Sequence, residues 1–239
     1  MQGRPIVVLD FETTGLSAKD RVIEIAAIRV EESRETVFHR LCDPGFSLPW
    51  RITEITGLTN GDLAGQPAPH VAIQELQEAV LYDEPLLVAH NASFDLRFLN
   101  QEYRQAGLPL YGGPVICTRN LARGLFPTLG TYKLADLIAY LGIVNDRAHR
   151  ALDDVRATHA ALQQMLAVAD ARQLDPLLFG ALRGTRFDGT LRDVPLASTG
   201  KAKAETAATK TPKPAKPEPY IPRALQRFLQ MADRKGKQR

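Results

Sequence analysis

The sequence predicts an α/β fold, in which a sheet is flanked by helices. Short apolar runs rich in β-branched residues alternate with segments whose apolar residues have helical spacing. The first runs are joined by short connections, which are typical of antiparallel neighbours. With 239 residues, 44% of them hydrophobic, the chain can form one large domain, or one domain followed by a tail.

The elements follow from these patterns in chain order. Strands are expected at residues 6–9, 21–30, 36–42, 86–90 and 114–118. Helices are expected at residues 71–81, within 90–107 with Asn91 or Ser93 as N-cap, at 121–126 and 134–141, and within 145–166. Residues 43–69 are interrupted by proline and glycine and receive neither assignment. The apolar pattern then continues to about residue 182.

The composition predicts a cytoplasmic protein. No apolar run approaches the roughly 20 residues of a membrane span. The N-terminus, MQGRPIVVLD, enters the first strand almost at once, so no signal peptide is expected. The two cysteines, Cys42 and Cys117, have no spacing typical of a metal clip or a disulfide framework, which fits a reducing compartment.

Charge is distributed unevenly along the chain. Residues 201–239 hold 11 Lys/Arg against 3 Asp/Glu, whereas residues 1–200 hold 19 against 24, within a net charge of +3. Such a basic tail binds partners in some proteins and only improves solubility in others. The acidic body is unlike a passive nucleic-acid binder, and carboxylates clustered around metal ions would explain part of its charge.

The stretch IVVLDFETTGL, residues 6–16, holds the first candidate site. Asp10 and Glu12 interrupt the apolar strand, and side chains two apart on a strand project from the same face. Two carboxylates this close repel each other unless a metal ion compensates them; the alternative is a solvated strand end. Gly15, in the turn that follows, would let a ligand approach the backbone.

Two further motifs place acidic residues at helix starts. In HNASFDLRFL, Asp95 follows a strand directly, at the edge of an α/β sheet where ligands bind. The helix dipole alone would also favour it there. In HRALDD, Asp154 lies in the opening turn of the long helix, and His149 lies on the preceding loop, from which it could reach a metal site. A structural role for His149 is the alternative.

Together these residues form the set that two-metal phosphodiester hydrolysis requires. Four carboxylates, Asp10, Glu12, Asp95 and Asp154, can hold two Mg²⁺ ions, which prefer carboxylate and water ligands. Histidine side chains can take up and release protons near neutral pH, so His149 is the candidate to accept a proton from the attacking water.

The three motifs DFETTGL, HNASFDLRFL and HRALDD resemble those of the DEDD superfamily of 3′–5′ exonucleases. This superfamily includes the epsilon proofreading subunit of bacterial DNA polymerase III, RNase T and the three-prime repair exonucleases. The resemblance covers about residues 5–166. A His five residues before the last Asp is similar to the His subtype, whereas the Tyr subtype would have Tyr where Arg150 stands.

This resemblance implies a ribonuclease-H-like five-stranded mixed sheet flanked by helices, with the first three strands antiparallel. It implies that Asp10 bridges both metal ions, that Glu12 and Asp154 complete the ion binding the attacking water, and that Asp95 holds the other. His149 would be the general base, and Mn²⁺ could replace Mg²⁺. Backbone amides at Thr13 and Thr14 would contact the terminal sugar, and two apolar side chains would pack on the terminal bases: Leu16 and Ile55. A core role for Ile55 is the alternative.

The resemblance leaves the substrate open. Single-stranded or frayed DNA ends, with proofreading in replication or repair, are the main expectation. RNA trimming of the RNase T kind is a second, and a non-catalytic nucleic-acid-binding adaptor is a third.

The C-terminal region is expected to lie outside the exonuclease domain, residues 1–182. Residues 183–219 are predicted to be an irregular segment and a disordered Ala/Lys/Pro-rich linker. Residues 220–239 predict a short basic amphipathic helix, either a docking segment for a DNA polymerase or sliding clamp or a helix that frays in solution. QLDPLLF, residues 173–179, loosely resembles clamp-binding peptides, although a helix end packed on the core explains it better.

Overall fold

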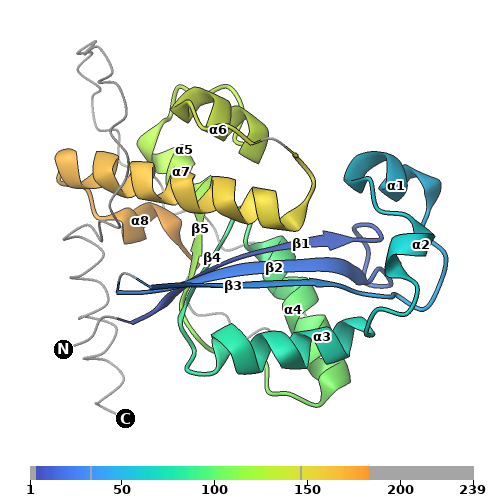
Figure 1. The fold of residues 1–239 in the computed structure, drawn as a ribbon. Helices are drawn as coiled ribbons and strands as arrows, with labels where there is room; N and C mark the ends of the chain where they lie inside the picture. Colours follow the sequence, from blue (N-terminus) through green and yellow to red (C-terminus); the bar gives the residue numbers. More distant parts are fainter. Residues whose placement is uncertain (1–3, 33, 146, 183–239) are drawn as a thin grey trace.

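The computed structural model describes residues 4–32, 34–145 and 147–182, which form a mixed sheet between two helical layers (Figure 1). The strand order is β3-β2-β1-β4-β5-β6. The strands are β1 (Ile6–Thr13), β2 (Val22–Glu31), β3 (Arg34–Leu41), β4 (Leu86–Ala89), β5 (Val115–Cys117) and β6 (Ala181–Leu182). The first three are antiparallel, while β4 is parallel to β1 and β5 is parallel to β4.

This arrangement confirms the expected five-stranded mixed sheet of the ribonuclease-H-like fold. The two-residue strand β6 adds a sixth member, which pairs antiparallel with β5. Because β1, β4 and β5 run in the same direction, their carboxyl ends meet at one edge of the sheet, where ligand sites form in α/β folds.

Helices cover both faces of the sheet (Figure 1). One face packs against α5 (Thr118–Leu125), α6 (Leu134–Leu141) and α7 (Ala151–Ala171), and the other against α3 (Pro69–Leu76) and α4 (Ser93–Ala106). A π-helical turn, η1 (Gln77–Leu81), continues α3, and α8 (Pro176–Gly180) packs on α5. Two short helices, α1 (Trp50–Thr56) and α2 (Asn60–Leu63), follow β3.

Strand β1 alternates between the two layers, and this alternation sets the direction of its carboxylates. Val7 and Leu9 belong to the apolar cluster under α3 and α4, whereas Ile6 and Val8 belong to the cluster under α7. Side chains two apart share a face, so Asp10 and Glu12 continue the row of Ile6 and Val8 on the α7 side. The expectation that the two carboxylates project together is therefore met.

Three local expectations were wrong. The strand β1 does not stop at Leu9 but remains paired with β2 as far as Thr13, because backbone hydrogen bonding is indifferent to side-chain charge. Residues 43–69 contain α1 and α2, and α2 is held by a capping box between Thr59 and Asp62. Neither Asn91 nor Ser93 caps α4, whose N-cap is Ala92. Asn91 instead has a left-handed backbone, with φ of 67°.

A buried ion pair fastens α4 to the beginning of β2. Arg21 donates from Nε and Nη2 to the two carboxylate oxygens of Glu102, at 2.8 and 2.9 Å. The Glu102 side chain is fully buried. This bidentate pair lies on the α4 side of the sheet, away from the α7 layer.

The segment 173–179 is part of the packed domain. A Cβ built on Gly124 of α5 would lie 2.2 Å from the Phe179 ring, so α8 approaches α5 closely there. This packing supports the interpretation of a helix end on the core. The predicted linker and terminal helix, residues 183–219 and 220–239, lie outside the described residues. Within the described part, no helix is both long and apolar enough to cross a membrane.

Candidate active site

The candidate site lies where β1 ends beneath the first turn of α7. In the β1–β2 ladder Asp10 is opposite Ala26 and Glu12 is opposite Glu24. The register shifts between Glu12 and Thr13, which marks a bulge. Bulges commonly occur beside active sites because they redirect side chains.

Asp95 and Asp154 reach the same place from two helices. Asp95 is in the first turn of α4, is 2% exposed and accepts a backbone hydrogen bond from Phe11 of β1. Asp154 is in the first turn of α7 and is 8% exposed. Both carboxylates are thus held at helix starts, where the helix dipole favours negative charge.

His149 completes the group from the loop before α7. One ligand atom each from Glu12, His149 and Asp154 lies within 4.8 Å of the other two. The backbone of His149 is left-handed, with φ of 63°, and its amide donates to Oδ2 of Asp154 at 3.1 Å. The loop position of His149 therefore lets it share the cleft with Asp154, as the sequence suggested.

The carboxylates raise one another's pKa. Burial raises the pKa of Asp10 well above its usual value, and the charges of Asp95, Glu12 and Asp154 raise it further. Burial followed by the charge of Asp154 raises the pKa of Glu12 to about 8, and burial raises that of Asp95 to about 8. Burial also raises the pKa of Asp154, against hydrogen bonds from Asn145 and His149. The cleft is therefore short of positive charge.

This donor set fits divalent cations. Carboxylate oxygens are the ligands that Mg²⁺ and Mn²⁺ prefer, and a bound cation would relieve the mutual repulsion that raises these pKa values. The side-chain Oδ1 of Asn145 is also buried beside Asp154 without a hydrogen-bond partner. The residues present thus suit a metal centre.

Two side chains near the cleft were missed by sequence reasoning. Asn145 donates from Nδ2 to Oδ1 of Asp154 at 2.6 Å, and nothing in its sequence context marks it. Glu24 accepts hydrogen bonds from Arg150, the Ala151 amide and His39. Burial alone would raise the pKa of Glu24, but these bonds outweigh it and lower the pKa to about 2. A lone acid in the apolar run VIEIAAI was the available signal for Glu24.

The expected substrate-contacting residues lie at the end of β1, in the turn after it, and in α1. Leu16 and Ile55 are exposed, at 77% and 44%, so both are open to a ligand and neither is an ordinary core residue. Thr13 and Thr14 are buried. The Thr14 amide already donates to the carbonyl of Arg21 at 2.9 Å, so it is not available for the implied sugar contact. A Cβ on Gly15 would meet the Asp20 carboxylate at 2.7 Å, which explains the glycine by packing.

A cavity of about 770 Å³ adjoins the carboxylates on the α6 side. It is lined by Asp154 and His149, by Arg119 and Lys133, and by His90 together with apolar residues of α6. Burial lowers the pKa of His90 to about 4, and its ring nitrogens are bonded to Thr118 and to the Tyr132 carbonyl. His90 is therefore neutral near neutral pH, and both of its ring nitrogens are already bonded.

Comparison with known proteins agrees with this geometry. The family model RNase_T, described as Exonuclease, matches residues 7–162. A DNA polymerase III PolC-type from Halalkalibacterium halodurans is 39% identical over 186 residues, which are 77% of this chain but only 13% of the polymerase. The DNA polymerase III subunit epsilon of Aquifex aeolicus is 37% identical over 154 residues, 64% of this chain and 75% of that subunit.

A solved structure shows the same architecture. Exonuclease X, in complex with 5′ overhanging duplex DNA, aligns with a TM-score of 0.55 at 28% identity, covering 69% of this chain and 92% of Exonuclease X. The fold and the matched family model thus define the class of exonucleases. The chain belongs to the exonuclease family, and the epsilon subunit of DNA polymerase III is among its relatives.

The raised pKa values predict that the metal-free protein loses stability as pH rises. Glu12 and Asp95 have folded pKa values of about 8, above their ordinary values of 4.5 and 3.8. Their protonation therefore stabilises the fold fully below about pH 4, and this contribution is lost as pH rises towards 8. In EDTA, thermal unfolding should shift to lower temperature between pH 5 and 8.

Two controls accompany this measurement. Glu12→Gln cannot ionise, so its unfolding temperature should fall less over the same range. Mn²⁺ should raise the unfolding temperature of the unaltered chain more at pH 8 than at pH 5. A metal-free unfolding temperature that stays level or rises from pH 5 to 8 would contradict the inferred crowding of charge.

Proposed function

We propose that this chain removes nucleotides from the 3′ ends of single-stranded or frayed DNA, releasing nucleoside 5′-monophosphates with the help of two Mg²⁺ ions. Two observations support the proposal in a chain of the exonuclease family: the charges of Asp95, Glu12 and Asp154 all act on Asp10, and His149 lies close to Glu12 and Asp154. The choice of DNA is supported by the relatives, which are named for DNA polymerase III, and by Exonuclease X with its bound DNA.

Asp10, Glu12, Asp95 and Asp154 are the proposed metal ligands. When bound, the two ions would stabilise the attacking and the leaving oxygen of the phosphodiester, and Mn²⁺ would substitute for Mg²⁺. The four side chains start from one strand and two helices packed on it, so their positions are set before substrate arrives. This preorganisation avoids reorganisation cost in the transition state.

His149 is the proposed general base. An imidazole on an exposed loop can exchange its proton with solvent after each turnover, and it lies next to the Glu12 and Asp154 carboxylates. It would accept a proton from the attacking water at a ring nitrogen. The bond from its own amide to Asp154 fixes the backbone of this residue relative to the acidic group.

Leu16 and Ile55 are the proposed contacts of the terminal bases, with Thr13 and Thr14 beneath them. Exposed aliphatic side chains pack on any base, so this end of the site would accept all four nucleotides. Thr14 would act through its position, since its amide is already engaged with Arg21.

The first test is metal-dependent shortening of a 5′-labelled single strand, offered as DNA and as RNA. The chain should shorten DNA with Mg²⁺ or Mn²⁺ and not with EDTA, whereas Asp10→Ala should still bind the strand but leave it intact. Faster shortening of RNA would favour the trimming alternative. Strand binding without shortening of either polymer would favour the adaptor and end the exonuclease proposal.

The second test concerns the base. His149→Ala should lower the turnover rate by about 10²- to 10⁴-fold, because water must then lose its proton without a positioned acceptor. Mn²⁺ binding, measured by calorimetry, should persist because the four carboxylates remain. If the rate of His149→Ala stays within about twofold of the original across neutral pH, His149 has another role.

Residues 183–239 are proposed to be a tether and docking segment outside the catalytic domain, 1–182. A DNA polymerase is the proposed partner, from the epsilon relative, with a sliding clamp as the alternative. The close packing of the partly buried Phe179 against α5 argues against residues 173–179 as a free clamp-binding peptide.

The third test is deletion of residues 201–239. Activity on short oligonucleotides should stay within about threefold of the full chain, since the four carboxylates and His149 are all retained. Capture of a purified polymerase core by the chain should be lost. A collapse of oligonucleotide shortening in the deleted chain would mean that these residues belong to the active domain.

A further inference from the structure

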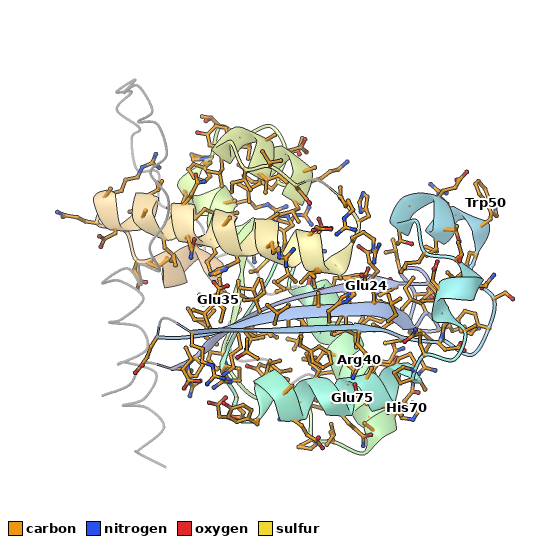
Figure 2. The ribbon with its side chains drawn as sticks, in the orientation of Figure 1. Glu24, Glu35, Arg40, Trp50, His70 and Glu75 are labelled. Atoms are coloured by element: carbon orange, nitrogen blue, oxygen red, sulfur yellow. The ribbon has the colours of Figure 1, made fainter. Side chains whose placement is uncertain are left out.

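Glu24 is a fully buried carboxylate flanked on β2 by apolar residues, Val22 and Ile23 before it and Ile25 to Ile28 after it. It lies between the sheet and the first turn of α7 (Figure 2). Arg150 donates to it from Nε at 3.1 Å and from Nη2 at 3.0 Å, and the amide of Ala151 donates at 3.2 Å. The ring of His39 on β3 lies 2.7 Å away. Both carboxylate oxygens are therefore fully engaged.

These bonds hold the residues next to the proposed base. Arg150 is the N-cap residue of α7, and its side chain makes no capping bond to its own helix. Glu24 supplies that function from another strand, because it accepts the free amide of Ala151 in the first turn. His149 immediately precedes this anchored pair, and Asp154 follows within one helical turn.

The same carboxylate is also tied to the acidic cleft through the sheet. Glu24 is opposite Glu12 in the β1–β2 ladder, so the two Cα positions are fixed relative to each other by strand pairing. These residues are therefore linked in a ring. Strand pairing joins Glu12 to Glu24, and hydrogen bonds join Glu24 to Arg150. The backbone joins Arg150 to His149, which lies close to Glu12.

We propose that Glu24 is a positioning residue for catalysis, which clamps Arg150 and Ala151 to β2 and so holds the His149 imidazole against Glu12 and Asp154. The inference rests on the proposed role of His149. Glu24 would act by fixing the position of the His149 ring, since a displacement of a catalytic group by about 1 Å can cost about 100-fold in rate. Both oxygens of Glu24 already accept hydrogen bonds, so Glu24 is proposed neither as a metal ligand nor as a substrate contact.

Glu24→Gln is the informative variant, because it keeps the shape of the side chain. The amide nitrogen must then face either the Arg150 guanidinium or the Ala151 amide, and two donors cannot bond each other. A matched control exists in Glu102→Gln. Glu102 is also fully buried and accepts two hydrogen bonds from an arginine, but this pair joins α4 to Arg21, directly before β2, on the other face of the sheet.

The experiment measures kcat, KM and thermal unfolding for both variants, alone and combined with His149→Ala. Glu24→Gln should lower kcat by about 10- to 100-fold with KM changed by less than about twofold. Glu102→Gln should lower the unfolding temperature comparably and leave kcat within about twofold. In the His149→Ala background, Glu24→Gln should cost less than about threefold, because the group it positions is gone.

Two kinetic results for Glu24→Gln would overturn the proposal. One is a kcat for Glu24→Gln as high as that of Glu102→Gln. The other is an undiminished loss in the His149→Ala background, which would mean that Glu24 acts only through overall stability. Should Glu24→Gln fail to fold, Arg150→Lys replaces it; this variant keeps the charge but not the two-point geometry, and a kcat reduced about 3- to 10-fold is expected, with an unchanged kcat counting against the proposal.

A readout without turnover separates this proposal from the proposed function. The proton chemical shifts of the His149 ring should move in Glu24→Gln and stay unchanged in Glu102→Gln, with or without nuclease activity. Inactivity of the unaltered chain would therefore end the exonuclease proposal alone. An unmoved His149 resonance in Glu24→Gln would end the positioning role alone.

Discussion

Mutual repulsion among four carboxylates is the constraint on which the rest of this structure depends. Asp10 and Glu12 project from one face of β1, and Asp95 and Asp154 are brought to them by two helices packed on opposite faces of the sheet. Burial raises the pKa values of Asp10, Asp95 and Asp154. The charges of the other three carboxylates raise the pKa of Asp10 further. The fold accepts this cost because the apolar core on both faces holds the elements in place regardless.

The surrounding polar groups act differently on the individual acids. Asn145 and the His149 amide bind Asp154, and the Phe11 amide binds Asp95, so these two carboxylates have fixed positions. Glu24 is different, because its carboxylate is hydrogen-bonded to Arg150, to His39 and to the Ala151 amide of α7. Five acidic side chains thus lie at this end of β1 and β2. All but Glu24 have carboxylate oxygens that remain available to a cation.

The sequence predicted much of the fold, and its failures were local. The strand β1 continues through Asp10 and Glu12 because its ladder with β2 outweighs their polarity. The helices α1 and α2 were missed in a segment with many helix breakers, where Thr59 and Asp62 form a cap within four residues. Gly15 was interpreted as an approach to a ligand, whereas the Asp20 carboxylate fills that space.

By itself the sequence determined which chemistry is available. The alternation of side chains on a strand put Asp10 and Glu12 on one face, and the motif order supplied Asp95, His149 and Asp154 after them. Only the tertiary structure decided how His149 meets Glu12 and Asp154, because that meeting depends on a left-handed backbone at His149 and on the hold of Glu24 on Arg150. Glu24 and Arg150 are 126 positions apart in the sequence, and no local pattern in either segment encodes their contact.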